Sequence, residues 1–79
     1  MNLMVDTDKI RKYMIDNKIK TIKALAIASG ISERVTYQIF SHQVRPSTAV
    51  IDKLVKALNI PASEAGEIFF KPNLHEMQA

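Results

Sequence analysis

The chain has 79 residues, a formal net charge of +3 and no cysteine. A chain of this length forms one small domain, here taken as residues 1–79, that buries about 60% of its unfolded surface. The lack of cysteine excludes a disulfide framework and a thiolate metal site. No apolar run approaches the ~20 residues that span a bilayer, and the first residues lack a signal peptide's apolar core, so we expect a cytoplasmic protein without a membrane segment.

The apolar spacing predicts an all-α chain, and its first two helices are short. The first follows a capping cluster at residues 6–8 and runs from Lys9 to about Asn17. Thr21 caps the second helix, which ends near Gly30. Glycine tolerates the left-handed backbone that a sharp turn requires, so we expect a tight turn at this point.

Two further helices follow this turn. Ser32 caps the third, which runs to about Phe40, and Pro46 ends any continuation because it lacks an amide donor. Ser47 or Thr48 caps the fourth, whose apolar residues repeat three and four apart and give the clearest amphipathic pattern of the chain. At the end of this helix we expect a left-handed C-cap, formed by the asparagine at position 59.

A fifth short helix opens at Pro61 and Ser63 and ends at Phe69 or Phe70. No alternating segment of strand length is present. We therefore expect a folded core over about residues 8–70, followed by a flexible tail over 71–79.

The basic residues are concentrated in one part of the chain. From Lys9 to Arg45 there are eight basic residues against two acidic ones, a net charge of +6, whereas the rest of the chain carries −3. This asymmetry favours a polyanionic partner such as nucleic acid. A charged surface that serves solubility alone is the other interpretation.

Within the basic part, residues 22–41 form a helix, a turn and a second helix, with the small residue Ala26 where the backbones approach. This is the geometry of a helix-turn-helix that places its second helix in the major groove of DNA. The chain resembles the Cro and phage-repressor family (XRE type) over about residues 8–70. The residues that carry the resemblance are Thr21, Leu25-Ala26, Gly30-Ile31-Ser32, Ile39, Pro46-Ser47 and the pattern Leu54…Ala57-Leu58…Ile60. The resemblance implies a compact five-helix domain of the lambda-repressor type.

Two positions depart from the family pattern. Ile22 stands where the family commonly has a phosphate-binding glutamine, and Thr36 stands where it usually has a buried valine or isoleucine. Ile22 can pack inward with Ile19, and the Thr36 methyl group can fill a small gap against Ala26.

The third helix carries the candidate base-reading residues. Helical spacing places Ile31, Thr36 and Ile39 inside, and the opposite side carries Glu33, Arg34, Tyr37, Gln38 and Ser41. The resemblance implies base contacts by Glu33, Arg34 and Gln38. Arginine matches guanine, glutamine matches adenine, and glutamate accepts from the cytosine amino group. Glu33 can instead stabilise the helix dipole or orient Arg34. Tyr37 can stack on a thymine methyl group, form a hydrogen bond with a phosphate, or lie half-buried at the surface of the domain.

Phosphate contacts are expected on both sides of this helix. The candidates are Lys20, Thr21, Lys23, Ser32, Ser41, His42, Gln43 and Arg45. Any single lysine among them can also be a solvated surface charge.

The function predicted is that of a sequence-specific regulator of transcription, not an enzyme, with double-stranded DNA as its partner and no cofactor or metal. The resemblance implies a Cro-like phage or mobile-element repressor. A symmetric homodimer on a palindromic operator is expected, with its contact surface in residues 60–70 and Phe69 in the monomer's own core. The alternatives are a module that binds and modulates a partner repressor, as an antirepressor does, and an antitoxin-type regulator.

Overall fold

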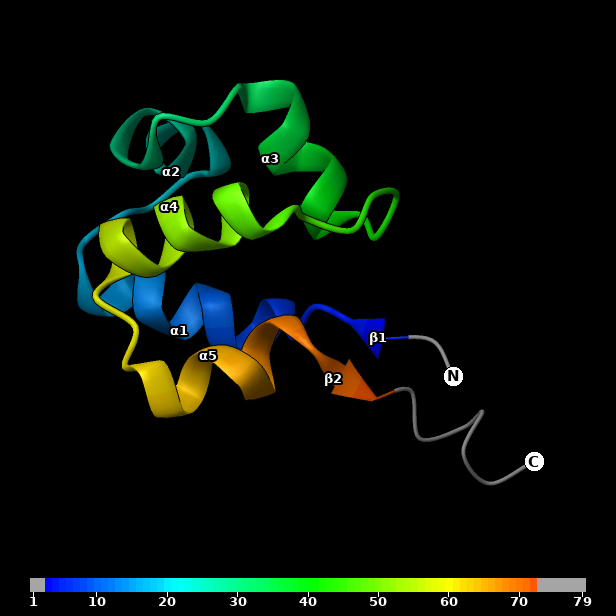
Figure 1. The fold of residues 1–79 in the computed structure, drawn as a ribbon. Coiled ribbons are helices and arrows are strands. Elements are labelled where there is room, and N and C mark those ends of the chain that lie inside the picture. The colour runs from blue at the N-terminus through cyan, green and yellow to red at the C-terminus, as the bar shows by residue number, and fades with distance from the viewer. Residues whose placement is uncertain (1–2, 73–79) are drawn as a thin grey trace.

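The computed structural model describes residues 3–72. Helices α2 and α3 lie at one end of the molecule and α5 at the other, with α1 and α4 between them (Figure 1). The elements in chain order are β1 (Leu3–Met4), α1 (Thr7–Asp16), α2 (Ile22–Ser29), α3 (Glu33–Phe40), α4 (Thr48–Leu58), α5 (Ala62–Phe69) and β2 (Lys71–Pro72). The five predicted helices and the all-α fold class are confirmed, with boundaries close to those that the sequence indicates.

Side-chain caps explain where the helices begin. The side chains of Thr21, Ser32 and Ser47 each accept a hydrogen bond from the backbone N–H three residues further on. Asp6 does the same for α1. Of the two predicted caps for α4, the structure uses Ser47, and α5 begins after Pro61 without a side-chain cap. Each such cap satisfies one of the amides that a helix start leaves without a partner.

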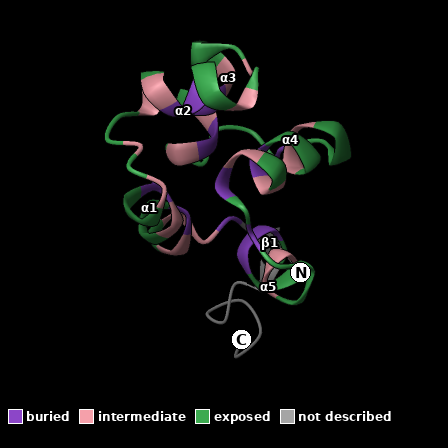
Figure 2. Cartoon of the chain, turned by 90° about the vertical axis from the view of Figure 1, so that its left-hand side faces the viewer, coloured by how far each residue is buried: buried purple, intermediate pink, exposed green. Residues whose placement is uncertain are grey.

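The core is formed by the apolar sides of the five helices, which pack against one another. Figure 2 shows these buried residues facing the interior, where the helices meet. The buried apolar residues are Val5, Ile10, Met14, Leu25, Ile39, Leu54, Leu58, Ile60, Ile68 and Phe69, which pack as one cluster. Val5 lies before the core boundary that the sequence predicts, so the packed core begins a few residues earlier.

The two ends of the described chain pair with each other. Strands β1 and β2 are antiparallel, with Leu3 opposite Pro72 and Met4 opposite Lys71. The sequence does not predict this pairing, because two residues are too few for an alternating pattern. Lys71 and Pro72, predicted as part of a flexible tail, are therefore in a strand, while residues 73–79 lie outside the described part.

The approach of α1 to α5 sets this register. The backbone N–H of Asp6 donates to the carbonyl of Ile68 at 2.6 Å. Lys9 Nζ lies 3.2 Å from Glu67 Oε2, and this hydrogen bond raises the pKa of the Lys9 ammonium. These contacts join elements far apart in sequence and hold the first residues of α1 beside α5.

An asparagine pair joins the ends of α1 and α4. Asn17 Nδ2 donates to the carbonyl of Leu58 at 2.9 Å, and Asn59 Nδ2 donates to Asn17 Oδ1 at 3.0 Å. Asn59 adopts the predicted left-handed C-cap conformation, with φ at 55°. These bonds fix the end of α1 relative to α4 and so position the segment that leads into α2.

Candidate nucleic-acid interface

The turn between α2 and α3 is built as the sequence predicts. Gly30 has a φ of 72° and is the left-handed C-cap of α2. The N–H of Gly30 donates to Ile27 and that of Ile31 donates to Ala26, the bond pattern of a glycine-terminated helix. Ala26 is buried, and α2 packs against α3 and α4. The small residue and the glycine together set the relative position of the two helices.

Replacing Gly30 with alanine is expected to destabilise the domain by about 1–2 kcal/mol because of backbone strain alone. A Cβ at this position would meet nothing within 4 Å, so no steric clash contributes. Gly66 is the matched control, because it lies inside α5, where a Cβ also meets nothing. Gly66→Ala should stabilise the chain by about 0.5–1 kcal/mol. Urea unfolding measures both, and equal effects at the two sites would contradict the strained turn.

Helix α3 turns one side fully inward. Thr36 is 0% exposed and Ile39 is 1% exposed, as the helical spacing predicts. The Thr36 hydroxyl is satisfied because its Oγ1 donates to the carbonyl of Ser32 at 2.8 Å. A threonine therefore occupies this core position without an unpaired buried hydroxyl, which accounts for the departure from the family pattern.

The opposite side of α3 faces solvent and carries the candidate base-reading residues. Glu33, Arg34 and Tyr37 are exposed, and Gln38 is partly buried. Figure 2 shows the outer side of α3 as exposed. Tyr37 is 60% exposed, so the alternative of a half-buried tyrosine does not describe this structure. The four side chains occupy one helix within two turns, a spacing that can reach neighbouring base pairs.

Two candidate phosphate ligands are the capping hydroxyls at the starts of α2 and α3. Thr21 Oγ1 accepts from the N–H of Ala24, and Ser32 Oγ accepts from the N–H of Val35. Each hydroxyl uses a lone pair as the cap, which leaves its proton available for a phosphate oxygen. Lys20 and Lys23, on either side of Thr21, are exposed.

The other candidates follow the end of α3. Ser41 Oγ donates to the carbonyl of Tyr37 at 3.0 Å, so its only proton is already used within the helix. His42 has a φ of 59°, and the N–H of Gln43 donates to Gln38 at 2.9 Å, which closes the turn. The side chains of His42, Gln43 and Arg45 are exposed. The turn is thus ordered by backbone bonds and leaves three polar side chains facing solvent.

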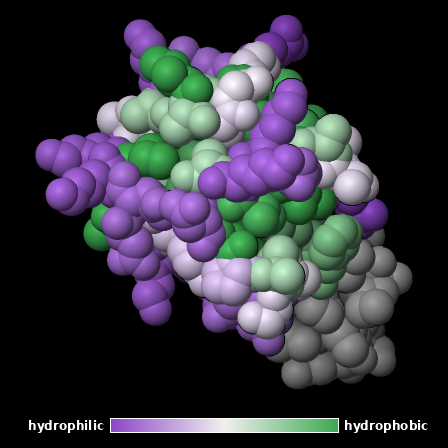
Figure 3. All heavy atoms as spheres, turned by 60° about the vertical axis from the view of Figure 1, so that its left-hand side comes forward, coloured by the Kyte–Doolittle hydropathy of each residue, from purple (hydrophilic) through white to green (hydrophobic). Residues whose placement is uncertain are grey.

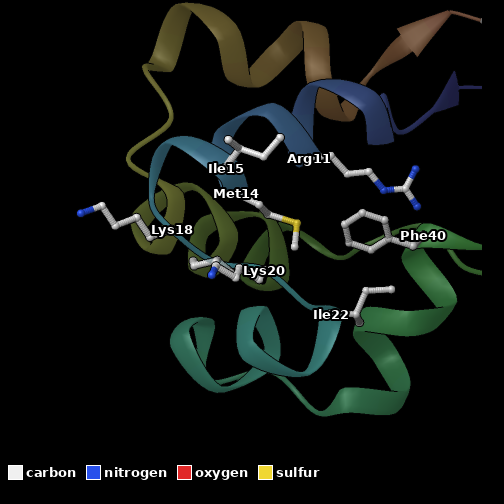
Figure 4. A pocket seen from close by; sticks show the side chains of 8 residues that line it. Arg11, Met14, Ile15, Lys18, Lys20, Ile22 and Phe40 are labelled. Carbon is white, nitrogen blue, oxygen red and sulfur yellow. The ribbon is translucent and has the colours of Figure 1, made fainter.

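The start of α2 lies beside the end of α3. Both contribute to a groove of about 600 Å³ whose apolar walls are Met14, Ile15, Ile19, Ile22 and Phe40 (Figure 4). Ile22 and Ile19 line it together, but only Ile19 also packs against the core cluster, so the inward packing considered for Ile22 is not observed. Among the phosphate candidates, Lys20 lines the same groove as Phe40 at the end of α3, whereas Ser32 lies at the start of that helix.

Sequence reasoning did not assign a role to Arg11. Its guanidinium carbon lies 5.2 Å from the centre of the Phe40 ring, a cation–π contact between α1 and α3. Arg11 is exposed and adds a positive charge beside the end of α3. The contact depends on the approach of two helices that lie nearly thirty positions apart, so no local pattern indicates it.

The predicted dimer surface is only partly available. Ile60, Ile68 and Phe69 lie in the monomer's core and are at most 5% exposed, whereas Phe70 is 48% exposed. The expectation that Phe69 closes the core is confirmed. The prediction of a contact surface over residues 60–70 is wrong for Ile60 and Ile68, because both side chains belong to the monomer's core cluster.

A glycine turn between two packed helices, with the second helix presenting an exposed polar side, defines a helix-turn-helix DNA-binding domain. The chain belongs to the Cro/C1-type HTH DNA-binding domain family, whose model matches residues 9–68. Comparison with curated proteins gives no match, and comparison with solved structures gives none. Within residues 3–72, every helix is too short or too polar to cross a lipid bilayer. No cluster of three His, Asp or Glu side chains in this described part could hold a metal ion.

Proposed function

We propose that this protein is a transcriptional repressor that binds a palindromic operator as a symmetric dimer. In this proposal α3 enters the major groove and its exposed residues read base edges. The observation that carries the proposal is the division of α3 into a buried side, with Thr36 and Ile39, and an exposed side with Glu33, Arg34 and Tyr37. Such a helix is held rigidly by the core while its polar side remains free for a ligand.

The phosphate contacts would come from the two ends of this helix. Thr21 and Ser32 offer hydroxyl protons, while Lys20, Lys23 and Arg45 offer charge. His42, Gln43 and Ser41 complete the proposed set. A phosphate accepts hydrogen bonds and donates none, so Ser41 can contact it only after its hydroxyl proton rotates away from the carbonyl of Tyr37. Contacts of this kind fix the register of a protein on DNA without reading sequence.

A dimer is part of the proposal because one helix covers only a few base pairs. Two copies related by a two-fold axis would place their α3 helices in successive major grooves, about 34 Å apart. Phe70 is the exposed aromatic side chain at the end of α5, and we place the dimer contact around it. Occupied operator DNA would then be closed to RNA polymerase, as in Cro-like regulators of phages and mobile elements.

The affinity for the promoter beside the protein's own gene should fall steeply with salt. A dimer that neutralises about eight phosphates has an expected log–log slope near −7. Lys23→Ala removes one phosphate contact from each subunit and should make the slope shallower by about 2, with equal losses on specific and random DNA. Fluorescence anisotropy between about 50 and 300 mM salt measures both slopes.

The matched control is Lys53→Ala, because Lys53 is exposed on α4 outside the proposed contacts. Its slope should equal that of the unmodified protein. DNA binding that is absent at every salt concentration would overturn the repressor and favour a protein-binding modulator. Sedimentation of the free protein and of its complex tests the dimer, and a monomer in both would remove that part.

A further inference from the structure

We propose that the groove between α1, the start of α2 and the end of α3 is a docking site for an acidic amphipathic helix of a partner protein. The groove is lined by residues from three helices and from the segment between α1 and α2. The core holds these helices in place, so the groove is a fixed feature of the fold. Its walls are apolar and its rim is basic. Docking as such does not depend on whether the protein binds DNA.

The walls expose more apolar surface than the fold requires. Ile15 is 75% exposed, although its neighbour Met14 is buried in the core. A single exposed isoleucine is ordinary on a protein surface. Here it borders a hollow of about 600 Å³, a size within the range of ligand sites. On the face of the molecule that Figure 3 draws, hydrophobic residues are exposed among hydrophilic side chains.

The rim determines which partner fits. Arg11, Lys18 and Lys20 lie around the groove, and none of the residues that line it is acidic. Among the described residues, the ion pairs involve Lys9 and Lys56, so no carboxylate lies within 4 Å of these three cations. Figure 4 shows Arg11 and Lys18 at opposite ends of the groove, with Met14 between them and Phe40 beside Arg11.

These features match one mode of recognition. A helix with leucine-like side chains along one face can place them in an apolar groove, as amphipathic helices do in many complexes. Glutamates or aspartates flanking that face would meet the cations at the two ends of the groove. Charge complementarity of this kind selects the partner and its orientation, and a basic helix with the same apolar face would be rejected.

Docking should also affect DNA binding, an effect that rests on the proposed function. Lys20 belongs both to the rim and to the proposed phosphate contacts at the start of α2. An acidic helix that pairs with Lys20 would withdraw that charge from DNA and place negative charge beside the end of α3. The partner would therefore weaken operator binding.

The first test uses a fluorescein-labelled helical peptide of about 16 residues, with leucines three, four and seven positions after the first and glutamates on the flanks. We expect saturable binding to the full chain without DNA. Ile15→Gln should raise the Kd about tenfold. Ile27→Gln is the matched control, because Ile27 is 74% exposed on α2 and does not line the groove. It should change the Kd less than about twofold.

Charge is tested with Lys18→Glu, since Lys18 is on the rim but outside the proposed phosphate set. It should weaken peptide binding at least about fivefold, whereas Lys53→Glu on α4 should not. A peptide with lysines in place of the glutamates should not bind. The proposal fails if neither peptide binds, if both bind equally, or if Ile15 and Ile27 variants lose affinity alike.

The docking proposal would also be overturned if a second copy of the chain or duplex DNA occupied the groove. If Ile15→Gln converts a free dimer into a monomer in sedimentation, the groove is covered by a second copy. If duplex DNA, but not the acidic peptide, shifts the Ile15 methyl signal in NMR spectra, the groove belongs to nucleic acid. Peptide binding with these controls supports docking even where the chain shows no affinity for DNA, so the two proposals fail independently.

Discussion

Replacing Phe69 with alanine is expected to destabilise the domain by about 3–5 kcal/mol. Phe69 is 2% exposed and is one of the largest fully packed side chains of the single core cluster. At 0.05–0.15 kcal/mol per residue, a chain of this length has a total stability of about 4–12 kcal/mol. The variant is therefore expected to be largely unfolded at 25 °C or to melt at a much lower temperature. Circular dichroism during urea unfolding measures the loss.

The neighbouring phenylalanine is the matched control. Phe70 is 48% exposed, so Phe70→Ala removes an equal volume from the surface and should cost less than about 1 kcal/mol. Should Phe69→Ala fail to give a measurable folded state, Phe69→Leu provides a milder change, expected at about 1–2 kcal/mol. Similar losses at positions 69 and 70 would contradict the burial of Phe69 in the core, where α5 packs against α1.

Local chemistry explains why the helices were predictable. Four helix starts carry a Ser, Thr or Asp whose side chain accepts a hydrogen bond from the backbone N–H three residues further on. Capping residues of these types can be recognised from the sequence alone. The left-handed residues Gly30 and Asn59 are equally local signals. The division of α3 into two sides follows from helical spacing, because Thr36 and Ile39 are the positions that the core requires.

Features that depend on the approach of distant segments could not be predicted in this way. The pairing of β1 with β2 depends on how α1 meets α5, and Arg11 reaches Phe40 only after α1 and α3 have packed. The same holds for the groove, which is lined by residues from three helices and from the segment between α1 and α2. The sequence indicates that one phenylalanine of the pair at positions 69 and 70 is buried. That Ile60 and Ile68 are buried as well, and so are not available for a dimer contact, follows only from the packing of the helices.

Arg34→Ala is expected to remove the preference for one base pair in each half-site of the operator. Arg34 is exposed near the start of α3, where a guanidinium can donate two parallel hydrogen bonds to guanine O6 and N7. Such a contact contributes about 1–3 kcal/mol of discrimination, which corresponds to about 5–150-fold in affinity for each half-site. Selection from randomised duplexes, performed with both proteins, measures which position loses its preference.

Arg34→Lys separates base reading from charge. Lysine keeps the positive charge but lacks the planar pair of donors, so affinity for random DNA should stay within about threefold while discrimination at that base pair falls. Lys23→Ala should show the reverse, with weaker binding to every sequence and an unchanged selected motif. If Arg34→Ala weakens specific and random DNA equally, Arg34 contacts phosphate. The reading of bases by α3 would then fall to Gln38, Glu33 and Tyr37, the other side chains on its outer side.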